Sequence, residues 1–292
     1  MYLLIDSNFV CHRTKYILQA LSYADRKTGI VFSFLNHILY LFDKFSTNKF
    51  IFAWDSRLSK RKEIFPKYKA FRIKKDKTKE ERTIDRMVFR QMDELRDYVL
   101  PRIGFKNIFQ QEGYEADDVI AKIVIDNHKK EDIIVVSNDN DLYQLLDYCS
   151  IYDLHKKQLL TKQWFLDQYG LAPPEWIEVK GLAGCTSDGI PGIKGIGEKT
   201  ALKYLLRQLP EKSKAYKSIV SNEGRKVSAF TQDLVSLPYP GTNNFEIVKD
   251  EFSLGNFMDI CGEYGLNSFL SKNTLNKWKQ FFGGTFNGNR IY

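Results

Sequence analysis

The stretch from Tyr114 to Leu146 constrains the fold of this chain more than any other. Its first part is acidic and runs into apolar residues at helical spacing, which predicts a helix that begins with carboxylates. Its second part contains residues 133–136, an apolar, β-branched run of strand length that is followed by two aspartates. In open α/β folds, ligands bind at the carboxyl ends of the parallel strands. We therefore expect five carboxylates to gather at that edge: Glu115, Asp117, Asp118, Asp139 and Asp141.

Clustered carboxylates repel one another unless cations lie between them, and all-oxygen sites favour hard divalent ions such as Mg²⁺. Each half of the stretch also has an ordinary structural explanation. Acidic residues are favoured in the first turn of any helix, and Asn and Asp commonly form turns after strands. The metal hypothesis therefore depends on both halves together and on partners elsewhere in the chain.

Two further predicted strands end in an aspartate. Residues 1–6 and 49–55 are short apolar runs, and residues 29–45 between them carry apolar positions at helical spacing. Strand, helix, strand is the pattern of a parallel βαβ unit. Asp6 and Asp55 would then lie at the same sheet edge as Asp139, although either alone would be an ordinary helix N-cap.

The remaining pattern predicts helices over 83–100, where Pro101 would end the helix, over 161–169 with Gly170 as the C-cap, and over 198–209. Another short strand is predicted over residues 150–154. The predicted fold class is α/β, with a central, mostly parallel sheet flanked by helices and a helical C-terminal region.

The excess positive charge of the chain is confined to residues 57–86. This basic segment holds 13 Lys/Arg and 5 Asp/Glu, so its net charge of +8 equals that of all 292 residues. A charge run is usually a solvated loop. Here aromatic residues alternate with the cations, and aromatic faces can stack on bases while Lys and Arg neutralise phosphates. We therefore expect nucleic-acid contacts from this segment, with Lys67, Lys74 and Lys75 among them.

A glycine-rich run, residues 184–201, is the other informative stretch. Gly195 and Gly197 stand just before a predicted helix, where exposed backbone N–H groups form a site for a phosphate. Glycines between helices are more often simple connectors, but Asp188 upstream and Lys199 downstream favour the phosphate interpretation. The candidate DNA-binding positions of this run are Gly192, Lys194, Gly195, Gly197, Lys199 and Thr200.

Composition narrows the class of protein. A hydrophobic fraction of 43% and an aromatic fraction of 14% are typical of a globular chain. The four cysteines are scattered without a CxxC pair, which predicts reduced thiols and excludes a cysteine-rich zinc site. No signal peptide or membrane-spanning run is visible, so we expect a cytoplasmic protein without a membrane partner.

Three motifs occur in order: Tyr-Glu-Ala-Asp-Asp at 114–118, Ser-Asn-Asp-x-Asp-Leu-x-Gln-Leu at 137–145, and Ser-Asp-x-Ile-Pro-Gly-Ile-x-Gly-Ile-Gly-x-Lys-Thr-Ala at 187–201. In these the chain resembles the 5′-nuclease superfamily, which includes the 5′→3′ exonuclease domain of bacterial DNA polymerase I and bacteriophage flap endonucleases and ribonucleases H. The resemblance covers residues 1 to about 240. It implies a PIN-like nuclease domain over 1–180, with the basic segment 57–86 as a helical arch. It also implies a helical DNA-binding region over 181–292, with a helix-hairpin-helix at 190–209.

The resemblance also implies the chemistry. A structure-specific 5′ nuclease of this kind hydrolyses phosphodiester bonds in DNA with a 5′ flap or 5′ end, using two Mg²⁺ ions, with Mn²⁺ as an alternative. Lys69 and Arg72 would contact the scissile phosphate and Tyr68 would stack on a displaced base, while the helix-hairpin-helix would hold the duplex backbone with a bound K⁺. A monomer acting in the cytoplasm, or in the host cytoplasm if phage-encoded, is expected. The implied metal ligands are Asp6, Asp55, Glu115, Asp117, Asp118, Asp139, Asp141 and Asp188.

Two positions depart from the family pattern. Cys185 and Gly189 stand where the family usually has an aspartate and an asparagine. A thiol is a poor ligand for hard Mg²⁺, so we expect a weaker second metal site held mainly by Asp141 and Asp188. Two alternatives stay open: a ribonuclease H-like enzyme that removes RNA primers from RNA–DNA hybrids, and a structure-specific DNA-binding protein with a weakened metal site. Cutting of a labelled hybrid, or the absence of metal-stimulated cutting, would distinguish them.

Overall fold

The computed structural model describes residues 1–14, 21–70 and 78–284. The chain divides into two compact units. Unit 1 comprises Met1–Trp54, Asp76–Phe109 and Glu246–Tyr292, and unit 2 comprises Asp55–Lys75 and Gln110–Phe245. Among the described helices, none is both long enough and apolar enough to cross a bilayer.

The two central strands of unit 1, β1 (Tyr2–Asp6) and β4 (Phe50–Trp54), are almost entirely buried. β1 pairs in parallel with β4, with Ile5 opposite Phe52, and β5 (Ile108–Gln110) lies on the other side of β4. All five residues of β4 are buried, as expected for a strand covered by helices on both faces. The two strands predicted to lead into Asp6 and Asp55 are therefore confirmed.

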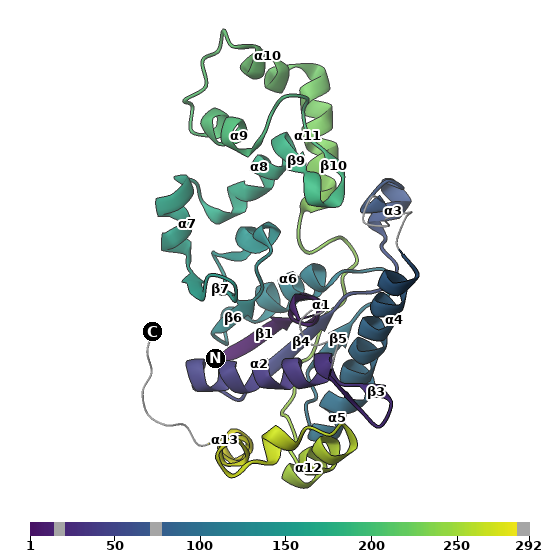
Figure 1. Cartoon of the computed structure of the whole chain (residues 1–292). Coiled ribbons are helices and arrows are strands. Elements are labelled where there is room, and N and C mark those ends of the chain that lie inside the picture. The colour runs from purple at the N-terminus through teal and green to yellow at the C-terminus, as the bar shows by residue number, and fades with distance from the viewer. Residues whose placement is uncertain (15–20, 71–77, 285–292) are drawn as a thin grey trace. The chain divides into compact units, whose positions relative to one another are not determined.

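Helix α2 (Gly29–Phe45) has the predicted bounds and runs alongside β1 and β4 (Figure 1). Its buried side chains pack on the strands; the Phe34 ring centroid lies 5.6 Å from that of Phe52 and 5.9 Å from that of Trp54. Two C-terminal helices, α12 (Leu254–Glu263) and α13 (Lys272–Gly283), are yellow in Figure 1; α12 packs beside α5 (Leu100–Ile103) and α13 beside α2. The smaller elements of unit 1 are α1 (Ser7–Arg13), β2 (Ser22–Tyr23), β3 (Arg26–Lys27) and η6 (Asn267–Leu270).

The helix predicted over 83–100 is shorter at both ends than the helix in the structure. It begins as α4 (Lys79–Glu94), because Thr78 and Glu81 form a capping box. It continues through a π-helical turn, η2 (Leu95–Val99), into α5 (Leu100–Ile103), which contains Pro101. Proline lacks an N–H and clashes with the carbonyl four residues earlier, and the wider π turn accommodates both effects. The helix ends instead at Gly104, whose φ of 114° only glycine adopts readily.

Unit 2 contains the strands β6 (Ile133–Val136), β7 (Ser150–Asp153) and β8 (Gln158–Leu160). β6 pairs in parallel with β7, and β8 pairs antiparallel with β7. With the parallel pair of unit 1, this confirms a mostly parallel sheet flanked by helices. The other elements of this part of unit 2 are α3 (Arg61–Ile64), α6 (Ala116–Asn127), η3 (Asn140–Leu145), α7 (Lys162–Tyr169) and η4 (Pro173–Glu175). Gly170 is the C-cap of α7, as predicted.

The helical part of unit 2 contains the glycine-rich run. α8 (Trp176–Ala183) and α9 (Glu198–Leu205) flank it, and Ile193 donates a backbone hydrogen bond to Leu182 (2.9 Å). A Cβ on Gly192 would lie 2.2 Å from the backbone of Ala183, so this turn requires glycine. α9 ends four residues earlier than predicted. The other elements here are β9 (Gly184–Cys185), η5 (Thr186–Asp188), β10 (Ile190–Pro191), α10 (Lys214–Val220) and α11 (Asn222–Val235).

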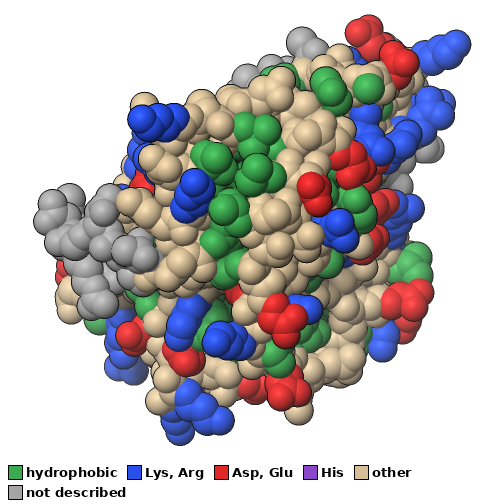
Figure 2. Space-filling view, turned by 90° about the horizontal axis from the view of Figure 1, so that it is seen from below, with side chains coloured by type: hydrophobic (Ala, Val, Ile, Leu, Met, Phe, Trp, Pro, Cys, Tyr) green, Lys and Arg blue, Asp and Glu red, His purple; other side chains and the backbone are tan. Residues whose placement is uncertain are grey.

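Charge is mixed on the face shown in Figure 2. Lys and Arg side chains alternate there with Asp and Glu around a strip of apolar side chains.

Candidate metal centre

Glu115 is fixed at the start of α6. It is the N-cap residue, and it forms a capping box with Asp118. The next residue, Ala116, donates its backbone N–H to Oδ1 of Asp55 (2.8 Å), which ties the residue following β4 to the same helix start. This hydrogen bond places the Asp55 carboxylate beside the first residue of α6, next in the chain to Glu115.

Tyr68 and Lys69 join Glu115 to Asp188. The Tyr68 hydroxyl donates to Glu115 Oε2 (2.7 Å) and to Asp188 Oδ2 (3.3 Å), and the Lys69 ammonium lies 2.8 Å and 3.7 Å from the same two oxygens. Lys69 has a left-handed backbone (φ 53°), which is uncommon for a lysine, and its N–H donates to the carbonyl of Asp188 (2.8 Å). Burial lowers the pKa of Lys69, but Glu115 and Asp188 raise it more, so the ammonium stays protonated.

A second group of ligand atoms belongs to Asp141, Cys185 and Asp188, whose ligand atoms all lie within 4.8 Å of one another. The Cys185 thiol donates to Asp141 Oδ2 at 3.7 Å. Asp139 precedes this group and accepts a hydrogen bond from the backbone N–H of Asp141 (2.8 Å). Burial, and then the charges of Asp141 and Asp188, raise the pKa of Asp139 to about 6, so burial and like charge both disfavour its ionised form.

Lys180 is a buried cation that sequence reasoning missed. Its ammonium lies 3.0 Å from Asp141 and 3.2 Å from Glu198, and it donates to the side-chain oxygen of Asn140 (2.9 Å). Only 4% of the residue is exposed. The available signal was a lysine inside the apolar helix α8, one turn after Trp176, where a charged residue needs a partner.

The donor set fits a divalent ion only in part. Carboxylate oxygens from Glu115, Asp139, Asp141 and Asp188 suit Mg²⁺ or Mn²⁺. Burial and Asp141 raise the pKa of the Cys185 thiol to about 11, so it stays a neutral, soft group beside hard ligands. The oxygen-rich part of the cluster therefore fits Mg²⁺, and the part around Cys185 does not.

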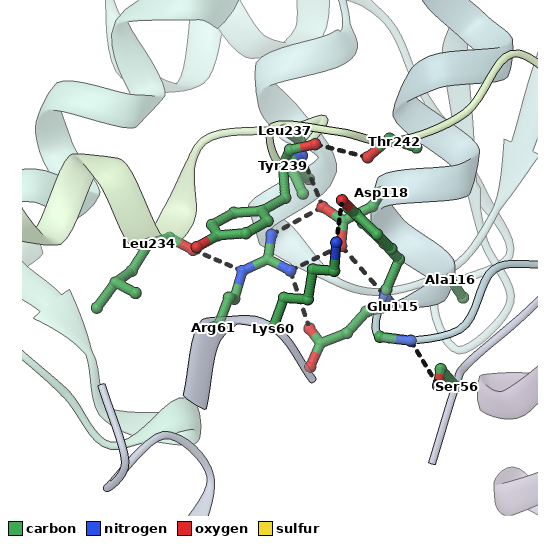
Figure 3. Close-up of polar contacts among 12 residues, drawn as sticks. Ser56, Lys60, Arg61, Glu115, Ala116, Asp118, Leu234, Leu237, Tyr239 and Thr242 are labelled. Atoms are coloured by element: carbon green, nitrogen blue, oxygen red, sulfur yellow. Dashed lines mark hydrogen bonds and ion pairs between the residues drawn. The ribbon is translucent and has the colours of Figure 1, made fainter. Parts of the chain in front are cut away.

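Asp118, which the resemblance implies as a metal ligand, contacts an arginine. Figure 3 shows the Arg61 guanidinium aimed at both carboxylate oxygens, at distances of 2.7 Å and 2.8 Å, with the Tyr239 ring beside it. Asp118 is fully buried. Arg61 was one of 13 basic residues in the basic segment, and nothing in its local sequence marks it as buried.

The other predicted residues are placed as follows. Asp6 belongs to unit 1, where it caps α1 by accepting the N–H of Phe9 (3.0 Å). The Tyr68 ring is only 2% exposed and packs with Cys185 and Leu234, so in this conformation it offers no free face to a base. Lys67 is exposed and Asp117 is half-buried. In the glycine-rich run, Lys194, Gly195, Gly197 and Lys199 are exposed, and Gly192 and Thr200 are half-buried. Arg72, Lys74 and Lys75 lie outside the described residues.

Comparison with known proteins bears on the same segments. Residues 1–170 match the model of the 5′-3′ exonuclease N-terminal resolvase-like domain. The chain is 32% identical to the thermostable DNA polymerase I of Thermus thermophilus over 208 residues, which cover 70% of this chain but 23% of the polymerase. It is 28% identical to a 5′-3′ exonuclease of Buchnera aphidicola over 250 residues, covering 84% of this chain and 79% of that protein.

Solved structures share the fold. The T5 D15 protein, co-crystallised with metal ions, superposes with a TM-score of 0.68 at 21% identity and covers 97% of this chain and 99% of its own. Human GEN1 in complex with Holliday junction DNA superposes with a TM-score of 0.58 at 13% identity, over 100% of this chain and 76% of its own. Since the family model matches more than half of its residues, the chain belongs to the 5′-3′ exonuclease family.

Proposed function

We propose that this chain is a divalent-metal-dependent, structure-specific 5′ nuclease that hydrolyses phosphodiester bonds in DNA with a 5′ flap or 5′ end. The observation that carries the proposal is the acidic cluster of unit 2. Glu115 and Asp188 are bridged by Tyr68 and Lys69, and Asp188 joins Asp141 and Cys185 within 4.8 Å. The raised pKa of Asp139 supports a site that is completed by a cation.

The proposed reaction uses groups that the chain holds in place. Divalent ions bound by the carboxylates would supply Lewis-acid activation of water and of the phosphodiester. Lys69 stays protonated and can offset charge on the phosphate. We propose the same role for Arg72, and a ligand role for Asp6, Asp55 and Asp117. The weakest ligand position is Cys185, where the second metal site of the family would need a carboxylate.

The glycine-rich run is the proposed contact for duplex backbone. Gly197 is the N-cap of α9, and a Cβ on either Gly195 or Gly197 would meet no atom within 4 Å. A phosphate can therefore approach these backbone N–H groups closely. Lys194 and Lys199 are exposed on either side. We propose that this turn binds a DNA phosphate, with K⁺ as the accompanying ion, and that the protein acts as a monomer in the cytoplasm.

Relatives support the choice of substrate. The chain is similar to proteins described as 5′-3′ exonucleases. A T5 structure with the same fold is described as a flap endonuclease in a pseudo-enzyme-product complex with DNA and metal ions. The chain spans about a quarter of the length of the DNA polymerase I sequences that it matches. The substrate is therefore proposed for this chain and is not taken from the activity of the whole polymerase.

The test is digestion of a 5′-labelled DNA flap, a nicked duplex and an RNA–DNA hybrid, with Mg²⁺ or with EDTA. We expect Mg²⁺-dependent cutting of the flap. The matched control is Asp139→Asn, which keeps the size and the hydrogen-bond acceptor of Asp139 but removes its charge. Faster cutting of the hybrid would favour the ribonuclease H-like alternative. Tight DNA binding without cutting in any metal would identify a DNA-binding protein and refute the nuclease.

A further inference from the structure

We propose that Asp118 is a positioning residue and not a metal ligand. Together with Arg61 it would fix Glu115, one of the residues that we expect to bind the metal. This inference rests on the proposed function, because it assumes a divalent ion beside Glu115. Asp118 lies in the Tyr-Glu-Ala-Asp-Asp motif, but no motif of the sequence pairs it with Arg61.

All the acceptor positions of Asp118 are already used. Oδ1 accepts from Arg61 (2.8 Å) and from the backbone N–H of Tyr239 (2.9 Å). Oδ2 accepts from Arg61 (2.7 Å) and from the backbone N–H of Glu115 (3.1 Å). A carboxylate has about four lone-pair positions. Four donors already contact the two carboxylate oxygens of the fully buried Asp118, so no lone-pair position is left for a metal ion.

Arg61 is held as firmly as its partner. Besides the two bonds to Asp118, its Nε donates to the carbonyl of Leu234 (2.8 Å), and its guanidinium lies 4.6 Å from the centroid of the Tyr239 ring. Arg61 is 3% exposed. The pair therefore connects three segments that are distant in sequence: the start of the basic segment, the first turn of α6, and the chain that follows α11 (Figure 3).

The pair acts on Glu115 in two ways. Asp118 holds the Glu115 backbone, so the direction of the Glu115 side chain depends on Asp118. A nitrogen of Arg61 also lies 3.8 Å from Glu115 Oε2. Groups that orient a metal ligand in this way commonly change metal affinity about 10- to 100-fold when they are removed, without being ligands themselves.

The first test is a double-mutant cycle on Mn²⁺ binding, measured by electron paramagnetic resonance on the full chain without DNA. The variants are Asp118→Asn, Arg61→Gln and the double variant. If Asp118 acts through Arg61, each single variant weakens binding about 10- to 100-fold with the wild-type number of ions bound. The Mn²⁺ affinity of the double variant should then lie within about twofold of that of the weaker-binding single variant.

Asp139→Asn, alone and with Arg61→Gln, is the matched control. As a variant of a proposed ligand it should lose a bound ion in either background. Two results would overturn the inference. One is the loss of a bound ion in Asp118→Asn. The other is a fold loss of Mn²⁺ affinity in the double variant that equals the product of the losses in Asp118→Asn and Arg61→Gln. If the wild-type protein binds no Mn²⁺ at all, the proposed function itself fails. That result is distinguishable from the two results that would overturn only the role of Asp118.

The second test needs no substitution, which matters because removing one member of a buried ion pair can unfold a protein. Hydrogen exchange of the Glu115 and Tyr239 backbone amides is measured in the wild-type protein with and without Mg²⁺. Both amides donate to Asp118, so we expect equal or greater protection with Mg²⁺. Exchange about tenfold faster at both amides on adding Mg²⁺ would show that Asp118 turns toward the ion, and would refute the proposal.

Discussion

Replacing Cys185 by aspartate tests the electrostatics of the acidic cluster. The Cys185 sulfur lies 3.7 Å from Asp141 Oδ2. Two unit negative charges at that separation repel by about 4 kcal/mol at an effective dielectric constant of about 20. The Lys180 ammonium, 3.0 Å from the other Asp141 oxygen, offsets part of this repulsion. We therefore expect the metal-free Cys185→Asp protein to be less stable than the wild type by about 2–4 kcal/mol.

The assay is thermal unfolding in EDTA and in Mg²⁺, with Cys185→Ser as the neutral control. In EDTA the melting temperature of Cys185→Asp should fall by about 5–15 °C, since about 1 kcal/mol shifts a chain of this size by roughly 2–4 °C. Mg²⁺ should restore most of the loss, because an ion that binds only the folded state stabilises it. The Mg²⁺-induced rise should be smaller in the wild type and in Cys185→Ser than in Cys185→Asp.

Equal Mg²⁺-induced rises in Cys185→Asp and Cys185→Ser would refute this reasoning. The new carboxylate would then have created no additional divalent-ion affinity, and the cluster of Asp141, Cys185 and Asp188 would not be the second metal site. A second assay measures flap cutting by the same proteins over a range of Mg²⁺ concentrations. The concentration needed for half-maximal cutting should fall in Cys185→Asp only.

Three further predictions concern Asp139 and Lys69. Asp139→Asn should bind flap DNA like the wild type but cut it at least about 100-fold more slowly, as seen in binding and single-turnover assays; wild-type cutting would remove Asp139 from the site. The pKa of Asp139 is raised from 3.8 to about 6 by burial and then by Asp141, so its ionisation opposes folding. Metal-free protein should therefore lose up to roughly 3 kcal/mol as pH rises from about 4 to above 6, and this loss should be absent in Asp139→Asn when unfolding is followed in EDTA. Lys69→Met should lower the single-turnover rate about 100-fold with little change in DNA affinity; a change in affinity alone would assign Lys69 to binding.

The sequence predicted the parts of the fold that depend on short-range patterns. The apolar periodicity of residues 29–45 gave the bounds of α2, and the β-branched run 133–136 gave β6. Pro101 was misread, because a proline ends a regular α-helix but can follow a π-helical turn. That turn depends on how α4 and its neighbours pack, which no local pattern records.

The candidate site was predictable where carboxylates follow strands or open helices, as at Asp55, Glu115 and Asp139. The two buried cations were not. Arg61 and Lys180 meet Asp118 and Asp141 across 57 and 39 positions of sequence, respectively. Their burial follows from tertiary packing, so the sequence alone does not distinguish Arg61 from the exposed cations of the basic segment. For Lys180 the sequence carried one signal that the prediction did not use, a lysine among the apolar residues of α8.

The most direct test of the whole account is to locate Mn²⁺ by its anomalous scattering in crystals of the wild-type protein. The account predicts anomalous density within coordinating distance of Glu115, Asp139 and neighbouring carboxylates, with none at Asp118. Manganese bound only at sites remote from these carboxylates, in protein that still cuts DNA in Mn²⁺, would contradict it.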